Sequence, residues 1–264
     1  MLKRNQFSLK SLVIALALAA VVCGLVFTLP RLLIEASQVR RSRNNMEWLA
    51  KAMRVYRSEK NRLFEAQIDK AYYGYPHSWR LDLCSHLSPI DYRSGYDFEK
   101  PWDAPENIDL ALELLSGRHC TVRVWGLPGE YRSPQKAYDP NDFETDVVLF
   151  VGEGTAFPPD RIFDPDEFPD GAENTLLAIE LIDSGIHWLE PRDLRYPEDI
   201  FEPSRDTLLK RIRAKNYTSH VIFADFKVFA LNPDLDSNQL EALITTSGGE
   251  SISRQQLVEQ GLLY

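Results

Sequence analysis

The sequence predicts a membrane-anchored protein of the α+β class, with one apolar helix near the N-terminus and a large folded head. Three observations support this prediction: a long uncharged run, an amphipathic stretch after it, and short apolar segments separated by turn residues in the remainder. With 264 residues, the chain has room beyond the apolar run for one sizeable domain or two small ones.

The apolar run covers residues 11–30 and contains 20 residues without a charge. A helix of that length spans about 30 Å, which is the thickness of the hydrocarbon core of a bilayer. A basic tail, residues 1–10, precedes the run, and Arg31 follows it. Because the run is long for a signal peptide and no A-x-A-like cleavage site follows it, we predict a retained transmembrane helix.

The stretch after the apolar run, residues 31–70, has the pattern of an extended amphipathic helix. Its apolar residues recur at steps of three and four, which places them on one helical face. The residues on this face are Met46, Leu49, Met53 and Tyr56. We expect the face to pack against the head.

The head, residues 71–264, mixes helical and strand patterns. Helices are predicted over 78–87, 107–115 and 239–246, and after a Ser253 cap through residue 262. Strands are predicted over 122–125, 147–152 and 175–182, and as two short strands that turn at 225–227 within 221–231. A proline-rich acidic loop is predicted over 158–171. This mixture predicts an α+β head.

Charge is distributed unevenly along the chain. Residues 1–45 contain seven Lys and Arg and one acid, Glu35, which leaves 23 basic and 38 acidic side chains for the remainder. An acidic head repels phosphate backbones, so nucleic acid is not expected as a partner. The basic segments that flank the apolar run suit anionic lipid headgroups, so membrane lipid is an expected partner.

The three cysteines leave the redox compartment open. Cys23 lies inside the apolar run, whereas Cys84 and Cys120 lie in the head. The latter two could form one disulfide outside the cytoplasm or remain free buried thiols. No CxxC occurs, so zinc-ribbon and thioredoxin-type sites are not predicted.

The N-terminus resembles that of type IV prepilins and pseudopilins, and the head resembles a large bacterial family of unknown function, abundant in planctomycetes, that carries such a start. The N-terminal resemblance rests on Phe7-Ser8-Leu9, Leu29-Pro30, Asn44-Asn45 and the helix that follows. The head resemblance rests on His77-Ser78-Trp79-Arg80, the run Tyr96 to Asn107 (YDFEKPWDAPEN), Gly152 to Phe157 (GEGTAF), Glu173-Asn174-Thr175, Ser184 to Leu194 (SGIHWLEPRDL) and Val221 to Asp225.

This resemblance implies a pilin-like fold, in which the long N-terminal membrane helix packs on an antiparallel β-sheet head. It also implies a single-pass protein of the bacterial cell membrane, with the N-terminus cytoplasmic and the head outside the cytoplasm. The chain departs from the family at Gln6, where prepilins have the Gly before the cleavage site, and at Ser11, where they have Glu. We therefore expect residues 1–6 to stay attached.

A third departure lies near the C-terminus. The family has a His ten residues before an Asp-Gly pair, whereas here Lys215 takes the place of that His and Asp225 is followed by Phe226.

Two groups of residues have side chains that could form a functional site. His187 lies near Glu180, Asp183, Glu190 and Asp193, a set that suits a metal site, an acid–base pair or a structural turn. Their spacing matches no H-E-x-x-H-like pattern. The aromatic residues Trp79, Tyr96, Phe98 and Trp102 could line a ligand groove or belong to the core.

Two loops are candidates for ligand binding. Gly152-Glu153-Gly154 follows a predicted strand, but Pro158 and Pro159 prevent the helix that a phosphate site requires, so no nucleotide is predicted. The acidic loop is the best candidate for a metal, calcium, because clustered carboxylates repel one another unless a cation binds them. Its predicted ligands are Asp160, Asp164, Asp166 and Asp170. The alternative is a solvated acidic loop.

The sequence therefore predicts a membrane-anchored, pseudopilin-like protein of the cell envelope with a structural or interaction role and no catalytic activity. Its expected partners are membrane lipid and other envelope or pseudopilin-like proteins. Two alternatives stay open: an anchored head that binds a small ligand or a polysaccharide, and a membrane-tethered metal-dependent hydrolase.

Overall fold

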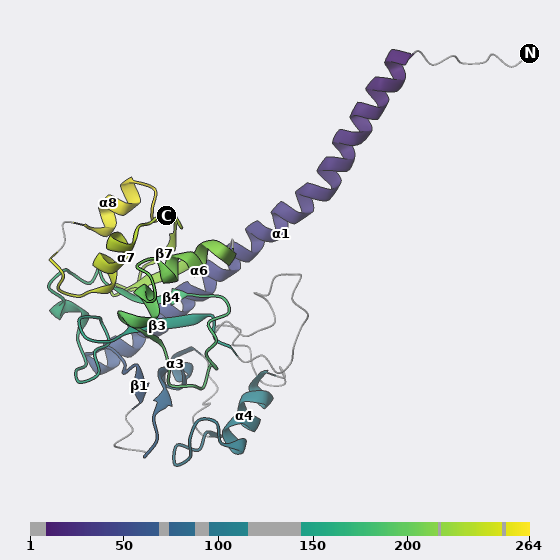
Figure 1. The fold of residues 1–264 in the computed structure, drawn as a ribbon. Helices are drawn as coiled ribbons and strands as arrows, with labels where there is room; N and C mark the ends of the chain where they lie inside the picture. Colours follow the sequence, from purple (N-terminus) through teal and green to yellow (C-terminus); the bar gives the residue numbers. More distant parts are fainter. Residues whose placement is uncertain (1–8, 69–73, 88–94, 116–143, 216–217, 250–251) are drawn as a thin grey trace, which may run out of the picture. The chain divides into compact units, whose positions relative to one another are not determined.

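The computed structural model describes residues 9–68, 74–87, 95–115, 144–215, 218–249 and 252–264. The chain divides into two compact units, Met1–Arg41 and Ser42–Tyr264. Helix α1, Leu9–Lys60, is 52 residues long and contains the boundary between them (Figure 1). The smaller unit is described by this helix alone.

The prediction of a transmembrane helix over 11–30 is wrong. A helix that crosses a bilayer needs about 20 consecutive apolar residues, and none of the helices in the described ranges meets that requirement of length and hydropathy. The single-pass location in a bacterial cell membrane, with a cytoplasmic N-terminus and an external head, is wrong for the same reason. Residues 11–30 do form a helix, as part of α1.

The larger unit is built on a five-stranded sheet with the order β5-β3-β4-β6-β7. The strands are β3 (Val147–Val151), β4 (Leu176–Glu180), β5 (Leu194–Arg195), β6 (Ser219–Phe223) and β7 (Val228–Leu231). Neighbouring strands are antiparallel except for β5, which runs parallel to β3. The pilin-like fold predicted for the chain is therefore wrong in a second respect: its sheet is mixed, and not purely antiparallel.

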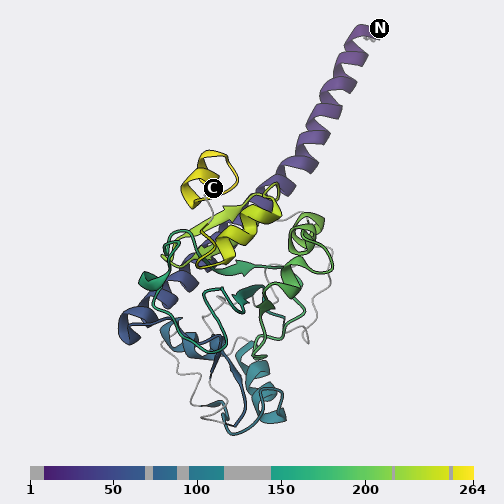
Figure 2. The same ribbon diagram turned by 60° about the vertical axis from the view of Figure 1, so that its left-hand side comes forward.

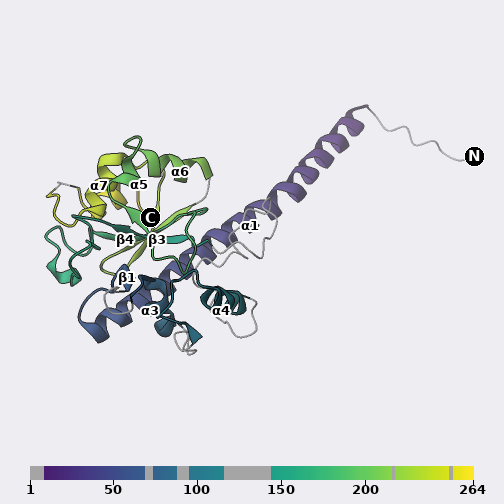
Figure 3. The same cartoon turned by 60° about the horizontal axis from the view of Figure 1, so that its bottom comes forward.

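Helices cover both faces of this sheet (Figures 2 and 3). Successive side chains of β3 alternate between the two faces, because a strand has a period of two: Leu149 belongs to one buried cluster and Val148 and Phe150 to the other. The first cluster contains the apolar face expected on the long helix, namely Met46, Leu49, Met53 and Tyr56. That prediction of core packing is confirmed.

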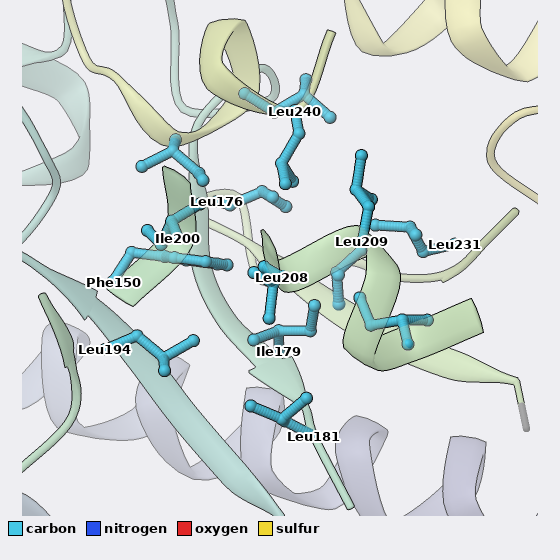
Figure 4. Packing of buried hydrophobic residues seen from close by; sticks show 14 of the residues in the cluster. Phe150, Leu176, Ile179, Leu181, Leu194, Ile200, Leu208, Leu209, Leu231 and Leu240 are labelled. Atoms are coloured by element: carbon cyan, nitrogen blue, oxygen red, sulfur yellow. The ribbon is translucent and has the colours of Figure 1, made fainter. Parts of the chain in front are cut away.

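The second cluster packs helices α5, α6, α7 and α8 on the opposite face (Figure 4). These helices are α5 (Glu198–Phe201), α6 (Thr207–Lys215), α7 (Ser237–Ile244) and α8 (Arg254–Glu259). Leu208, Leu209 and Leu240 are among the buried side chains they contribute. The sheet therefore lies between two apolar layers.

Elements with strong local signals are confirmed. They include α3 (Trp79–Leu87), α4 (Pro105–Leu115), the strands β3 and β4, and the β6–β7 hairpin. Ser253 caps α8 and completes a capping box with Gln256, as its sequence position predicts. The strand predicted over 122–125 lies outside the described residues.

Short elements were missed. The small sheet of β1 (Gln67–Ile68) and β2 (His77–Ser78), the 3-10 turn η2 (Pro165–Glu167), strand β5 and helices α5 and α6 had no predicted counterpart. Helix α6 carries Leu208, Leu209 and Ile212 on its buried side among basic residues. This amphipathic spacing is typical of a helix that packs one face on a core, so α6 could have been predicted from the sequence.

Candidate functional site

Three segments that are far apart in sequence meet in the larger unit: residues 77–80, 96–102 and 187–193. We call them the three-segment centre. Trp79 Nε1 donates to Asp193 Oδ2 at 2.9 Å, and His77 Nδ1 lies 2.9 Å from the hydroxyl of Tyr96. The rings of Trp102 and His187 lie 5.1 Å apart. All three segments are among those that carry the family resemblance.

An ion pair between Arg80 and Asp193 holds the centre to the sheet. Both side chains are buried, with exposed fractions of 0% and 2%, and the guanidinium lies 2.8 Å from the carboxylate. Asp193 also accepts from the backbone N–H of Leu149, and Arg80 donates to the carbonyl of Val147 at 2.8 Å. The pair therefore links α3 to β3.

Burial controls the ionisation of this pair. It raises the pKa of Asp193 to about 6, although the charge of Arg80 and three hydrogen bonds act in the opposite direction. Burial also lowers the pKa of Arg80, again against the effect of Asp193. Charges removed from water are costly even when paired, so the carboxylate depends on its full set of donors.

His77 fixes the segment at 96–98. Its Nε2 lies 2.9 Å from the carbonyl oxygen of Phe98, which can only accept, so Nε2 carries the proton. Nδ1 then accepts from the Tyr96 hydroxyl. Burial lowers the pKa of His77 and raises that of Tyr96. Both shifts favour the neutral forms of the two side chains, and these are the forms that make the hydrogen bonds described above.

His187 is held by its own loop and by Trp102. The N–H of Leu189 donates to His187 Nδ1 at 3.1 Å, and the ring is tilted by 34° from that of Trp102. Burial lowers the pKa of His187 to about 4, against the opposing charge of Glu190. The imidazole is therefore neutral near pH 7.

The carboxylates expected around His187 are only partly gathered there. Glu190 remains close, because one of its oxygens accepts from the His187 backbone N–H at 3.2 Å. Asp193 instead pairs with Arg80, and Glu180 belongs to a different centre. In the part of the chain that the structure describes, no three His, Cys, Asp or Glu residues are arranged to hold a metal.

A second buried centre joins Ser42 of α1, Glu180 of β4 and His220 of β6, and sequence reasoning missed it as a group. Ser42 Oγ donates to Glu180 Oε2 and lies 2.8 Å from His220 Nδ1. His220 Nδ1 is also 2.8 Å from the same carboxylate oxygen. The exposed fractions of the three residues are 5%, 5% and 1%.

The geometry of this serine centre differs from a catalytic relay. In a relay, one imidazole nitrogen faces the nucleophile and the other faces the acid. Here a single nitrogen, Nδ1 of His220, faces both Ser42 and Glu180. The backbone N–H of His220 adds a further donor to the Glu180 carboxylate at 3.3 Å. The arrangement satisfies a buried carboxylate and fixes α1 on the sheet.

A sequence signal for the serine centre did exist. Ser42 lies four residues before Met46, so it belongs to the same helical face as the apolar stripe. A polar residue on such a face requires a buried partner.

Of the four predicted calcium ligands, the structure brings Asp164 and Asp166 together, on the guanidinium of Arg57. Arg57 binds Asp164 at 2.8 Å and Asp166 at 2.7 Å, and Asp164 also caps η2. Asp170 accepts from the N–H of Gly248 at 2.8 Å, while Asp160 is exposed in a turn. The positive charge that the acidic loop requires is supplied by Arg57.

The remaining predicted residues fall into two groups. Of the four aromatic residues considered for a groove, Trp79 and Tyr96 are buried in the core, and Phe98 and Trp102 are partly buried beside it. The side chains of Cys84 and Cys120, and the residues around Gln6, lie outside the described part of the chain.

Comparison with family models, with curated proteins and with solved structures finds no match to this chain.

Proposed function

We propose that this chain is a non-catalytic module with a structural or interaction role. The observation that carries the proposal is the serine centre, where a serine, a histidine and a glutamate are buried and bind one another through one imidazole nitrogen. A nucleophile in that position has no second imidazole nitrogen arranged to relay its proton. The centre is suited to holding a helix in place.

The three-segment centre supports the same proposal. Its imidazoles are neutral near pH 7, and its buried ion pair bonds the backbone of β3 from both side chains, so that it links α3 to β3. We also propose membership of the bacterial family of unknown function that the motif segments resemble. The packing of those segments against one another supports treating them as one structural unit.

The charge of the chain indicates the kind of partner. Beyond residue 45 the chain carries 38 acidic and 23 basic side chains. A surface of that sign repels nucleic acid and steers basic protein surfaces toward it. We therefore propose a protein partner and not a nucleic acid.

The test compares Ser42→Ala with Ser58→Ala, a matched control on the exposed side of the same helix, where Ser58 Oγ donates to the carbonyl of Val55. Ser42→Ala should lower the melting temperature, since it removes a donor to a buried carboxylate, whereas Ser58→Ala should leave it nearly unchanged. A fluorophosphonate probe should label neither the wild-type chain nor the control. Labelling of Ser42 in the folded wild type, lost in Ser42→Ala, would show a reactive nucleophile and refute the proposal.

A second candidate function is the binding of a small neutral ligand, and one observation favours it. The indole N–H of Trp188 is buried and has no hydrogen-bond acceptor among the described residues. Trp188 packs in the same cluster as Tyr96, with Phe98 and Trp102 beside it. A buried donor without an acceptor is costly, and a ligand oxygen would relieve that cost.

Tryptophan fluorescence distinguishes the two functions. Neutral oligosaccharides are added to the wild-type chain, to Trp102→Ala and to Trp48→Phe, a control at an exposed tryptophan. A saturable change that is lost only in Trp102→Ala would favour ligand binding. An unchanged spectrum favours the structural or interaction role.

A further inference from the structure

The outer edge of β7 is covered by a short segment of the same chain, residues 262–264. Ala230 N donates to Tyr264 O at 2.7 Å, and Tyr264 N donates back to Ala230 O at 3.1 Å. Asn232 N donates to Leu262 O at 2.9 Å. Leu231 and Leu263 form an antiparallel bridge, and the C-terminal end of the chain lies near β7 in Figure 1. The segment therefore pairs with β7 as an additional strand would.

The side chains of residues 262–264 differ in burial, and this difference indicates which side chain the β7 edge recognises. Leu263 is completely buried and belongs to the same cluster as Leu231 and Leu257. Its neighbour Tyr264 has an exposed fraction of 56%. Backbone hydrogen bonds together with a pocket for one side chain are the means by which sheet edges bind extended peptides.

The segment is connected to the rest of the larger unit by a tight turn. Helix α8 ends at Glu259, and Gly261 has a φ of 72°, in the left-handed region that glycine adopts without strain. Leu262 N donates to Leu257 O at 2.8 Å. Residues 262–264 are thus held by the β7 edge, by the burial of Leu263 and by the packing of Leu262 against the same cluster.

We propose that the β7 edge is a strand-docking site, filled in cis by residues 262–264 and able to take the same segment from a second copy of this chain. An uncovered edge presents free N–H and C=O groups that accept another strand. The occupant is argued from complementarity, because the edge already binds this sequence with a register and a buried leucine. This inference rests on the proposed interaction role and names the surface that would perform it.

The test uses a labelled peptide of residues 260–264 (QGLLY) with a C-terminal amide, and the Leu263→Ser variant of the 264-residue chain. This variant weakens the cis segment by placing a hydroxyl in the leucine slot, and it leaves β7 unchanged. Fluorescence anisotropy should show saturable binding of the peptide to the variant. Binding to the wild type should be at least about tenfold weaker, because its edge is already occupied.

Two modified peptides provide matched controls. A methyl group on the nitrogen of the tyrosine removes the N–H that donates to Ala230 O, and should abolish binding. A methyl group on the nitrogen of the second leucine removes an N–H that donates to Leu257 O in the chain, away from β7, and should leave binding in place. A folded variant that binds no peptide, or binds both methylated peptides equally, refutes the strand-docking site.

A second variant keeps the test decisive if Leu263→Ser does not fold. Tyr264→Pro removes the same N–H from the cis segment and leaves Leu263 unchanged, and it should bind the peptide in the same way. Sedimentation of the wild type at increasing concentration should show a dimer that Tyr264→Pro does not form. A wild type that stays monomeric at every concentration excludes a second copy as the occupant. These outcomes are independent of the reactivity of Ser42, so the two proposals fail separately.

Discussion

The carboxylate of Asp193 and the guanidinium of Arg80 lie 2.8 Å apart in a region of the larger unit from which solvent is excluded. Asp193 follows the loop that precedes β5, and Arg80 lies in the first turn of α3. The carboxylate also accepts from Trp79 and from the backbone of Leu149. One buried charge thus organises contacts among α3, β3 and the segment that leads into β5.

The first prediction concerns this ion pair. Asp193→Asn leaves the buried guanidinium without its counter-charge, and should lower the free energy of unfolding by about 3–5 kcal/mol. Urea denaturation measures the change. Asp199→Asn, which breaks the exposed i,i+4 pair with Arg195, is the matched control and should cost less than about 1 kcal/mol. Equal losses in the two variants would contradict the prediction.

The second prediction concerns pH. His187 has a folded-state pKa of about 4, below its ordinary value of 6.5, so the unfolded chain binds more protons between these two values. Acidification from pH 7 to pH 4 should therefore lose up to about 3 kcal/mol of stability through this residue. Urea denaturation across that range should therefore show that the stability of the wild type, relative to that of His187→Gln, falls as the pH is lowered.

Ionisation of Asp193 changes the stability in the opposite direction over nearly the same pH range. The wild-type profile alone therefore does not isolate the contribution of His187, and the comparison with His187→Gln is needed. The folded-state pKa of Asp193 is about 6, above its ordinary value of 3.8, so the folded chain binds more protons between those values and its contribution to stability falls as the pH rises. The difference between wild type and His187→Gln removes this shared contribution. Parallel profiles for the two proteins would rule out a buried neutral His187.

The third prediction concerns Phe226 in the β6–β7 turn. Its φ is 62°, and its side chain is buried in the core. Phe226→Ala loses the ring and keeps the backbone strain, whereas Phe226→Gly loses the ring and relieves the strain. Both should be destabilising, and the glycine variant should be the more stable of the two by about 1 kcal/mol. Thermal unfolding of the pair measures the difference, and an alanine variant at least as stable would contradict it.

The fourth prediction concerns the acidic loop. Because Arg57 binds both Asp164 and Asp166, millimolar calcium should leave the melting temperature of the wild type unchanged. Arg57→Ala should lower that temperature, and Arg54→Ala, at an exposed position one turn earlier in the helix, should not. A calcium-dependent rise in the wild type that disappears in Asp164→Asn would contradict this prediction and support a calcium site.

Local sequence determined the elements whose signals are complete within a few residues. Ser253 with Gln256, and Asp236 with Gln239, form capping boxes that start α8 and α7. The apolar stripe from Met46 to Tyr56 placed its own helical face in the core. These features depend on backbone donors and side chains a few positions apart, so no distant partner is needed to recognise them.

The tertiary structure alone decided the rest. Strand β5 has two residues, and only its parallel pairing with β3 makes it a strand. Ser42 meets Glu180 and His220 across 138 and 178 positions of sequence, and Asp193 meets Arg80 across 113. A sequence shows that a buried charge or hydroxyl needs a partner, because desolvation is costly. It does not show which partner the folded chain brings within hydrogen-bond distance.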